Sequence, residues 1–154
     1  MAALAPDYMT EALDETPDGC VDLPALDRVL EMPADLIAVG PGLGRGPSVT
    51  AFVYGLLARS GAPLVLDADA LNACESGDER LHGRDGLDVI ITPHPGEMAR
   101  LAGTSVEDVQ ANRIEAARAF ATGHQVYVVL KGHRTVVACP DGQTFINLTG
   151  NPGM

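Results

Sequence analysis

A histidine and a carboxylate stand on a short loop, Thr92-Pro93-His94-Pro95-Gly96-Glu97, directly after an apolar run. That run, residues 88–91, is typical of a buried strand, and the prolines and the glycine end it abruptly. In open α/β sheets, ligands bind at the carboxyl ends of the strands. His94 and Glu97 are therefore candidates for orienting a polar substrate, although an ordinary proline-rich surface loop is the alternative. Their spacing does not match the helical zinc motif of metalloproteases, so we expect no metal site there.

A glycine-rich loop, residues 41–47, follows an earlier strand pattern and contains Gly42, Gly44 and Gly46. Glycine lets a backbone approach a ligand closely and point its N–H groups at an anion. The spacing differs from the dinucleotide-binding fingerprint, whose third glycine would fall at Pro47. A tight strand-to-helix turn without a ligand remains the alternative.

Two carboxylates and an amide, Asp67, Asp69 and Asn72, follow the next predicted strand. Such groups could hold a magnesium ion, a water or substrate hydroxyls. Capping of a short helix is the competing explanation.

A tight turn near the end of the chain carries two cations, Lys131 and Arg134, with Gly132 between strands and a hydroxyl at Thr135. Together these groups could hold a nucleotide phosphate, whereas taken alone they are typical of a solvated hairpin turn. The polar, glycine-rich residues 147–154 follow, and they would ordinarily be a frayed tail.

The composition indicates a globular α/β protein. The chain has 154 residues, 46% hydrophobic and only 4% aromatic, with 17 glycines and 11 prolines. Its net charge of −11 makes nucleic acid an unexpected partner, and no apolar run is long enough to span a membrane. Three scattered cysteines suggest neither a zinc site nor a disulfide framework, and they fit a reducing cytoplasm.

Alternating strand and helix patterns predict a mostly parallel sheet with helices on its faces. A proline-glycine turn at 140–142 predicts that the last two strands pair antiparallel near an edge. Ser48 is expected to cap one helix, and Thr104 to Glu107 to form a capping box for a later helix that ends near Gly123. The expected strands are 36–40, 63–67, 88–92, 125–130, 134–138 and 144–148, and the expected helices are 23–31, 48–60, 68–74, 95–102 and 105–123.

Six segments, in order along the chain, are more specific together than any one motif: Gly-Pro-Gly-Leu-Gly-Arg (40–45), Leu-Asp-Ala-Asp-Ala-Leu-Asn (66–72), Thr-Pro-His-Pro-Gly-Glu-Met-Ala-Arg-Leu (92–101), Asp-Val-Gln-Ala-Asn-Arg (108–113), Leu-Lys-Gly-His-Arg-Thr (130–135) and Gly-Asn-Pro-Gly-Met (150–154). They closely resemble the ADP-dependent NAD(P)H-hydrate dehydratase family, the carbohydrate kinase-like domain of nicotinamide-nucleotide repair proteins. The resemblance covers about residues 20–154.

The resemblance implies a ribokinase-like α/β fold, with a mostly parallel sheet, helices on both faces and an antiparallel edge hairpin. It implies a lyase that restores NADH or NADPH from its hydrated form, with ADP or ATP as phosphoryl donor and Mg²⁺ expected. The implied route is phosphorylation of the hydrate hydroxyl followed by loss of phosphate, a far better leaving group than hydroxide. A ribokinase-like vitamin or sugar kinase, or a non-catalytic nucleotide-binding remnant, is the alternative. Homo-oligomerisation is left open.

By the same resemblance, two sets of residues contact ligands. The set expected to bind the hydrate is Gly42, Gly44, Asp69, His94, Glu97 and Arg100. The set expected to bind the adenine nucleotide is Lys131, Gly132, His133, Arg134, Thr135, Asn147, Gly150 and Asn151.

The chain departs from the family at both ends. In relatives, Gly-Asn-Pro-Gly-Met continues into a loop that ends in Gly-Asp, whose Asp is the expected catalytic base; here it would lie beyond Met154. The glycine-rich opening section of the family is also not found. We therefore expect residues 1–154 to be a single partial domain, truncated at both ends, with sheet surface left uncovered. Without the anion hole and the base, turnover of hydrated NADH by these residues alone should be very low.

Overall fold

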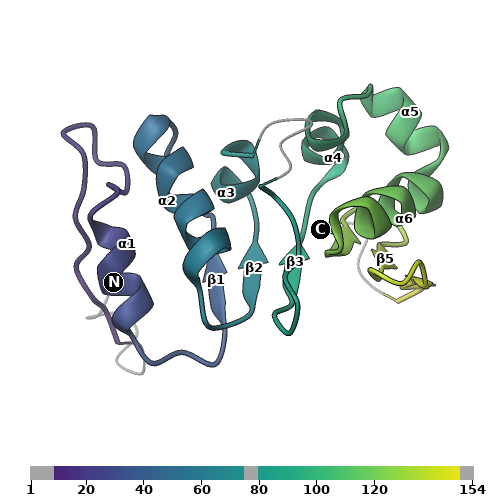
Figure 1. Cartoon of the computed structure of the whole chain (residues 1–154). Helices are drawn as coiled ribbons and strands as arrows, with labels where there is room; N and C mark the ends of the chain where they lie inside the picture. The colour runs from purple at the N-terminus through teal and green to yellow at the C-terminus, as the bar shows by residue number, and fades with distance from the viewer. Residues whose placement is uncertain (1–8, 75–79, 150–154) are drawn as a thin grey trace.

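Six short strands form one mixed sheet in the order β1-β2-β3-β4-β5-β6 (Figure 1). The structure is a computed structural model that describes residues 9–74 and 80–149. The strands are β1 (Ile37–Val39), β2 (Leu64–Leu66), β3 (Val89–Ile91), β4 (Tyr127–Leu130), β5 (Val136–Ala138) and β6 (Thr144–Ile146). Strands β1 to β4 are parallel, and β5 and β6 add an antiparallel hairpin at the edge. The predicted mostly parallel sheet with an edge hairpin is confirmed.

The helices of the described residues are α1 (Ala25–Glu31), α2 (Pro47–Arg59), α3 (Asp69–Asn72), α4 (Pro95–Ala102), α5 (Val106–Ala111) and α6 (Arg113–His124). None of these helices has the length and apolar character needed to cross a bilayer. The bounds of α4 match the prediction, because Pro95 starts the helix and Gly103 ends it in the left-handed conformation with φ +64°.

The connections between the parallel strands determine which face of the sheet the helices cover. Each connection moves to the next strand in the same direction, and such crossovers are right-handed, so α2, α3 and α6 fall on one face. Figure 1 shows α2 and α3 side by side across the β1–β2 part of the sheet. The strand side chains on that face are completely or almost completely buried, among them Leu64, Leu66, Ile91, Val128 and Leu130.

The second face of the sheet is apolar but less buried. Register partners align Val65 with Ile90, and Val129 with Val137 and then Phe145, in rows across the strands. These side chains stay partly exposed, up to 57% at Phe145. We expected helices on both faces, whereas the described helices cover only the first.

Two local predictions about helices are wrong. The helix expected over 105–123 is two helices, α5 and α6, because Asn112 takes a non-helical conformation between them. Val106 and Ile114, two apolar residues of this segment, are 42% and 43% exposed. Ser48 does not cap α2, whose N-cap is Gly46; the Ser48 hydroxyl instead donates to Asp22.

The predicted capping box from Thr104 to Glu107 is also wrong by one residue, because the N-cap of α5 is Ser105 and Asp108 occupies the third helical position. The Ser105 hydroxyl accepts the Asp108 backbone N–H at 3.0 Å and donates to the Asp108 carboxylate at 2.8 Å. Hydrogen bonds from Ser105 first, and then from Thr104, hold the pKa of Asp108 below its ordinary value.

Replacing Ser105 with Ala should lower the free energy of unfolding by about 1 kcal/mol, the usual cost of losing an N-cap. Urea unfolding at pH 7 measures that loss, and NMR titration should show the pKa of Asp108 moving back up. Thr104→Val is the matched control, since it removes one hydrogen bond to Asp108 and leaves the cap in place. Equal losses in the two variants would contradict this assignment.

Candidate functional site

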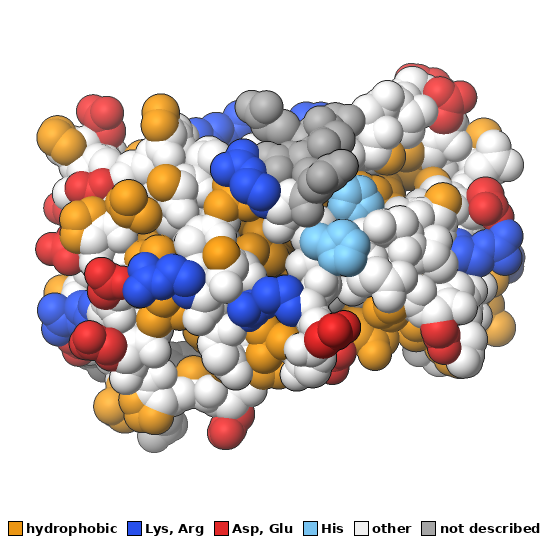
Figure 2. Space-filling model, in the orientation of Figure 1, with side chains coloured by type: hydrophobic (Ala, Val, Ile, Leu, Met, Phe, Trp, Pro, Cys, Tyr) orange, Lys and Arg blue, Asp and Glu red, His pale blue; other side chains and the backbone are white. Residues whose placement is uncertain are grey.

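The carboxyl ends of the four parallel strands bring four loops to one edge of the sheet. These loops are residues 40–46, 67–72, 92–97 and 131–135, and they contain most of the predicted ligand-binding residues. Figure 2 shows Lys, Arg and His side chains across the middle of one face of this acidic molecule. A chain with a net charge of −11 therefore still offers cationic groups locally.

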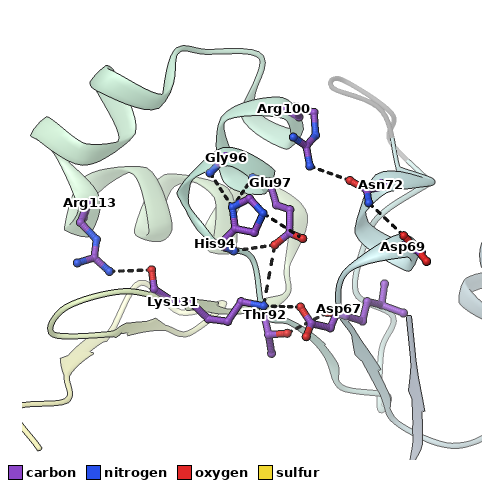
Figure 3. A network of polar contacts seen from close by, with 11 residues as sticks. Asp67, Asp69, Asn72, Thr92, His94, Gly96, Glu97, Arg100, Arg113 and Lys131 are labelled. Carbon is purple, nitrogen blue, oxygen red and sulfur yellow. Dashed lines mark hydrogen bonds and ion pairs between the residues drawn. The ribbon is translucent and has the colours of Figure 1, made fainter. Parts of the chain in front are cut away.

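A hydrogen-bonded chain joins the glycine loop to α4, and Figure 3 shows its part from Asp69 through Asn72 to Arg100. The Gly44 backbone N–H donates to Asp69 Oδ2 at 3.2 Å, and Asn72 Nδ2 lies 3.4 Å from Asp69 Oδ1. Arg100 Nη2 donates to Asn72 Oδ1 at 2.7 Å. Asp69 and Arg100, both predicted to bind the hydrate, are thus engaged with the protein itself. Gly42 stays exposed, with φ +81°.

The same elements line a hollow of about 170 Å³. Its lining residues are Gly44, Arg45, Gly46, Val49, Thr50, Asp69, Asn72, Ala73 and Arg100. Sites that enclose a drug-sized ligand are typically about 300–1,000 Å³. The hollow therefore has room for only part of a dinucleotide, in contact with two arginines, a carboxylate and an amide.

The chain turns sharply between Asp67 and Asp69. Ala68, between them, has φ +48° and ψ −115°, a backbone conformation that residues other than glycine rarely adopt. Such strain persists only where surrounding contacts fix it, and it concentrates at functional sites. Here it lets Asp67 face Lys131 (Figure 3), while Asp69 accepts the Gly44 N–H of the glycine loop.

Lys131 reaches across β3 to the end of β2. Its Nζ lies 2.6 Å from Asp67 Oδ1 and 4.0 Å from Glu97 Oε2. Burial by itself would raise the pKa of Asp67, but hydrogen bonds from Lys131, Thr92 and the Ala68 backbone, with the Lys131 charge, outweigh it and lower that pKa. Asp67 therefore stays ionised near neutral pH, and Glu97 is 5% exposed beside the pair.

His94 is the N-cap of α4, a role that the loop pattern did not indicate. Its Nδ1 accepts the backbone N–H groups of Gly96 and Glu97, at 3.0 and 3.3 Å. The Glu97 carboxylate in return accepts the His94 backbone N–H at 2.7 Å, which completes a capping box. Because Nδ1 accepts, the ring proton belongs on Nε2, which lies 3.4 Å from Glu97 Oε1. The imidazole remains half exposed.

The turn from Lys131 to Thr135 lies at the same edge, beside the end of β6. The Asn147 backbone N–H donates to the Thr135 carbonyl at 2.9 Å, so Asn147 adjoins the predicted nucleotide-binding turn. Gly132, His133 and Arg134 are exposed. Gly150 and Asn151, the remaining members of that predicted set, lie outside the described residues.

One residue that holds this turn had no assigned role in the motifs. Arg113, the first residue of α6, donates hydrogen bonds to three carbonyls of the segment 130–133. Its partners are 17 to 20 residues away along the chain, so no local spacing could have revealed the contact.

Comparison with known proteins agrees with this arrangement of segments. Residues 3–154 match the NAD(P)H-hydrate dehydratase family, further toward the N-terminus than the expected start near residue 20. The chain is 48% identical over 156 residues to the bifunctional NAD(P)H-hydrate repair enzyme Nnr of Moorella thermoacetica, covering all of this chain and 29% of that protein. It is 41% identical over 127 residues to the ADP-dependent (S)-NAD(P)H-hydrate dehydratase of Bacillus subtilis, covering 82% of this chain and 44% of that protein.

Solved structures show the same relationship. A crystal structure of the ADP/ATP-dependent NAD(P)H-hydrate dehydratase of Bacillus subtilis, co-crystallised with ATP and Mg²⁺ and soaked with CoA, superposes with a TM-score of 0.77 at 34% identity. It covers 97% of this chain, which spans 50% of that protein. A ribokinase-like superfamily protein of Enterococcus faecalis matches with a TM-score of 0.58 at 29% identity. The chain thus spans half or less of these relatives. Its ribokinase-like sheet and nearly full-length sequence match show that it belongs to the NAD(P)H-hydrate dehydratase family.

Proposed function

We propose that this chain is part of an enzyme that dehydrates hydrated NADH or NADPH. The reaction is a lyase reaction driven by ADP or ATP. The observation that carries the proposal is the meeting of the glycine loop, the His94 cap and the Lys131 turn at one sheet edge, in a chain of this family. A vitamin or sugar kinase is not favoured, because the matched family and these relatives are named for the hydrate.

The two ligands are assigned to neighbouring parts of the edge. The hydrate would lie against the hollow and His94, with Gly42, Gly44, Asp69, Glu97 and Arg100 around it. The nucleotide would lie against Lys131 to Thr135 and Asn147, with Gly150 and Asn151. Phosphorylation of the hydrate hydroxyl would then turn a poor leaving group into a good one. The catalytic base stays unassigned, and residues 1–154 are proposed to form a single partial domain.

We expect magnesium to bind together with the nucleotide, not in a site made entirely of protein ligands. The described residues contain no group of three or more His, Cys, Asp or Glu side chains that could hold a metal ion. Mg²⁺ usually keeps several waters and binds through substrate phosphates with one or two carboxylates. We therefore assign Mg²⁺ to the nucleotide phosphates.

Calorimetry of the chain with ADP and Mg²⁺ is the first test, followed by assay of NADH recovered from its hydrate. We expect ADP binding, with very low turnover by these residues alone. Failure to bind ADP or ATP would contradict the proposal. A stable phosphorylated product from a simple alcohol would favour the kinase instead.

Replacing His94 separates its two roles, as a cap and as a ligand for the hydrate. His94→Ala should cost about 1 kcal/mol of stability through the lost cap, whereas His94→Asn supplies another good cap. Both variants should weaken binding of hydrated NADH more than binding of ADP, because the proposal assigns His94 to the hydrate and not to the nucleotide. Calorimetry with each ligand and urea unfolding check this. If His94→Asn binds the hydrate as tightly as the unaltered chain, His94 is a cap alone.

A further inference from the structure

Arg113 occupies a position in α6 where an arginine is unfavourable for helix stability. It is the first residue of α6, where the aligned N–H groups of the helix give a partial positive charge that disfavours a cation. The acidic residue of that first turn, Glu115, pairs with Arg118 instead. The buried Arg113 Nε also has no hydrogen-bond partner, a further local cost. A residue that is locally unfavourable in this way is expected to make favourable contacts elsewhere in the structure.

Arg113 contacts the turn after β4, and Figure 3 shows its hydrogen bond to Lys131. Arg113 Nη2 donates to the carbonyl oxygens of Leu130 and Lys131, each at 3.1 Å, and Nη1 donates to the carbonyl oxygen of His133. One planar guanidinium therefore fixes three peptide units of a four-residue segment. Lysine could not do the same, because its single ammonium lacks the fork geometry.

The backbone of the turn is shaped to receive the guanidinium. Gly132 has φ +135°, and a Cβ built there would lie 3.0 Å from Arg113 Nη2. Arg134 has φ +55°, a backbone angle that residues other than glycine seldom adopt. The other anchors of the turn hold different atoms: the Lys131 N–H donates to Pro93, and Thr135 Oγ1 donates to Gly132.

Holding a carbonyl also directs an N–H group, because the two point in opposite directions across a trans peptide. With the Lys131 and His133 carbonyls turned toward Arg113, the N–H groups of Gly132 and Arg134 point away from it. Neither N–H donates to any described residue. Gly132 and Arg134 are separated only by His133, and free backbone N–H groups this close together in a turn can form a concavity that binds anions.

We propose that Arg113 is a positioning residue for the nucleotide: it does not touch the ligand but holds the turn so that the Gly132 and Arg134 N–H groups receive a phosphate. The inference rests on the proposed nucleotide binding and adds the residue that shapes the site. Because Gly132, His133 and Arg134 are exposed, water can satisfy the His133 carbonyl when Arg113 is replaced. The loss should therefore appear as a disordered turn rather than as an unfolded protein.

The test compares Arg113→Lys and Arg113→Met with Arg118→Lys and Arg118→Met, which alter an exposed arginine of the same helix. Calorimetry with ADP and Mg²⁺, amide exchange by NMR and thermal unfolding are measured on each. We expect both Arg113 variants to lose about tenfold or more in ADP affinity, with faster exchange confined to residues 131–135. Their thermal midpoints should stay close to those of the Arg118 controls.

Three outcomes would overturn the assignment. ADP affinity restored in Arg113→Lys would show that charge alone matters, and unchanged affinity in Arg113→Met would show no role. Exchange that rises throughout the protein would make Arg113 a general stabilising residue. Failure of the unaltered chain to bind ADP would be a different result. It would refute the proposed nucleotide binding itself, and the role of Arg113 in positioning a nucleotide site would fall with it.

Discussion

Replacing Gly40 with Ala should lower the free energy of unfolding by about 3–5 kcal/mol, which combines a severe steric overlap with backbone strain. Gly40 is buried at the end of β1 with φ +151°, and a Cβ there would lie 1.8 Å from the Asp67 carbonyl oxygen. The obstacle is backbone, so no side-chain rotation relieves it. The Asp67 N–H also donates to Val39 at this point, and the overlap would push β1 and β2 apart.

Gly61→Ala is the matched control. A Cβ at Gly61 meets no atom within 4 Å, so stability should stay within about 1 kcal/mol of the unaltered chain. Urea unfolding at pH 7 measures both variants, and calorimetry with ADP shows whether displaced Asp67 disturbs the Lys131 turn. A Gly40→Ala protein as stable as Gly61→Ala would refute the close approach of the two strand ends.

Lys131→Met should lower the free energy of unfolding by about 2 kcal/mol at pH 7. This value lies between the small contribution of an exposed ion pair and the larger loss when a buried ion pair is broken. Lys131 and Asp67 side chains are 41% and 34% exposed, which screens their attraction, but Glu97 is almost completely buried. Removing the ammonium leaves both carboxylates without their cation. ADP affinity should fall as well, if Lys131 binds phosphate as proposed.

The pH dependence of this loss has a definite sign. The folded-state pKa of Asp67 lies below its ordinary value of 3.8, so the pair stabilises the protein above that pH and loses its effect as the pH falls through the lower folded-state value. Without Lys131, burial is opposed only by the hydrogen bonds from Thr92 and the Ala68 backbone, so the pKa of Asp67 moves up from its value in the unaltered chain. The difference in stability between the unaltered chain and Lys131→Met should therefore shrink as the pH falls below about 3.8.

Urea unfolding from pH 7 to pH 3 measures this difference. Asp67→Asn is the control, and the double variant should lose less than the sum of the two single losses, because the two side chains share one interaction. A gap that stays constant with pH, or fully additive losses, would show that Asp67 does not titrate against Lys131.

Local signals in the sequence were enough for several elements. The bounds of α4 follow from a proline at its start and a left-handed glycine after its end. The β5–β6 hairpin follows from a proline-glycine turn between two short strand patterns. Helix periodicity was less reliable near the α5–α6 junction, because Asn112 interrupts an apolar spacing that continues across the break. Ser48 was misassigned because a serine before a helix pattern resembles a cap, whatever tertiary partner it has.

The sequence by itself determined the family, the mostly parallel character of the sheet and the four loops that carry polar groups, because these depend on the type and spacing of neighbouring residues. Only the tertiary structure decided which of those groups meet. Lys131 pairs with Asp67 across 64 residues because β3 separates β2 from β4 by one strand, a distance that the Lys131 side chain spans. Arg113 reaches the Lys131 turn because α6 packs beside β4, and His94 became a cap because its ring folds back onto its own helix. Contacts between distant segments depend on sheet register and packing, which no local spacing records.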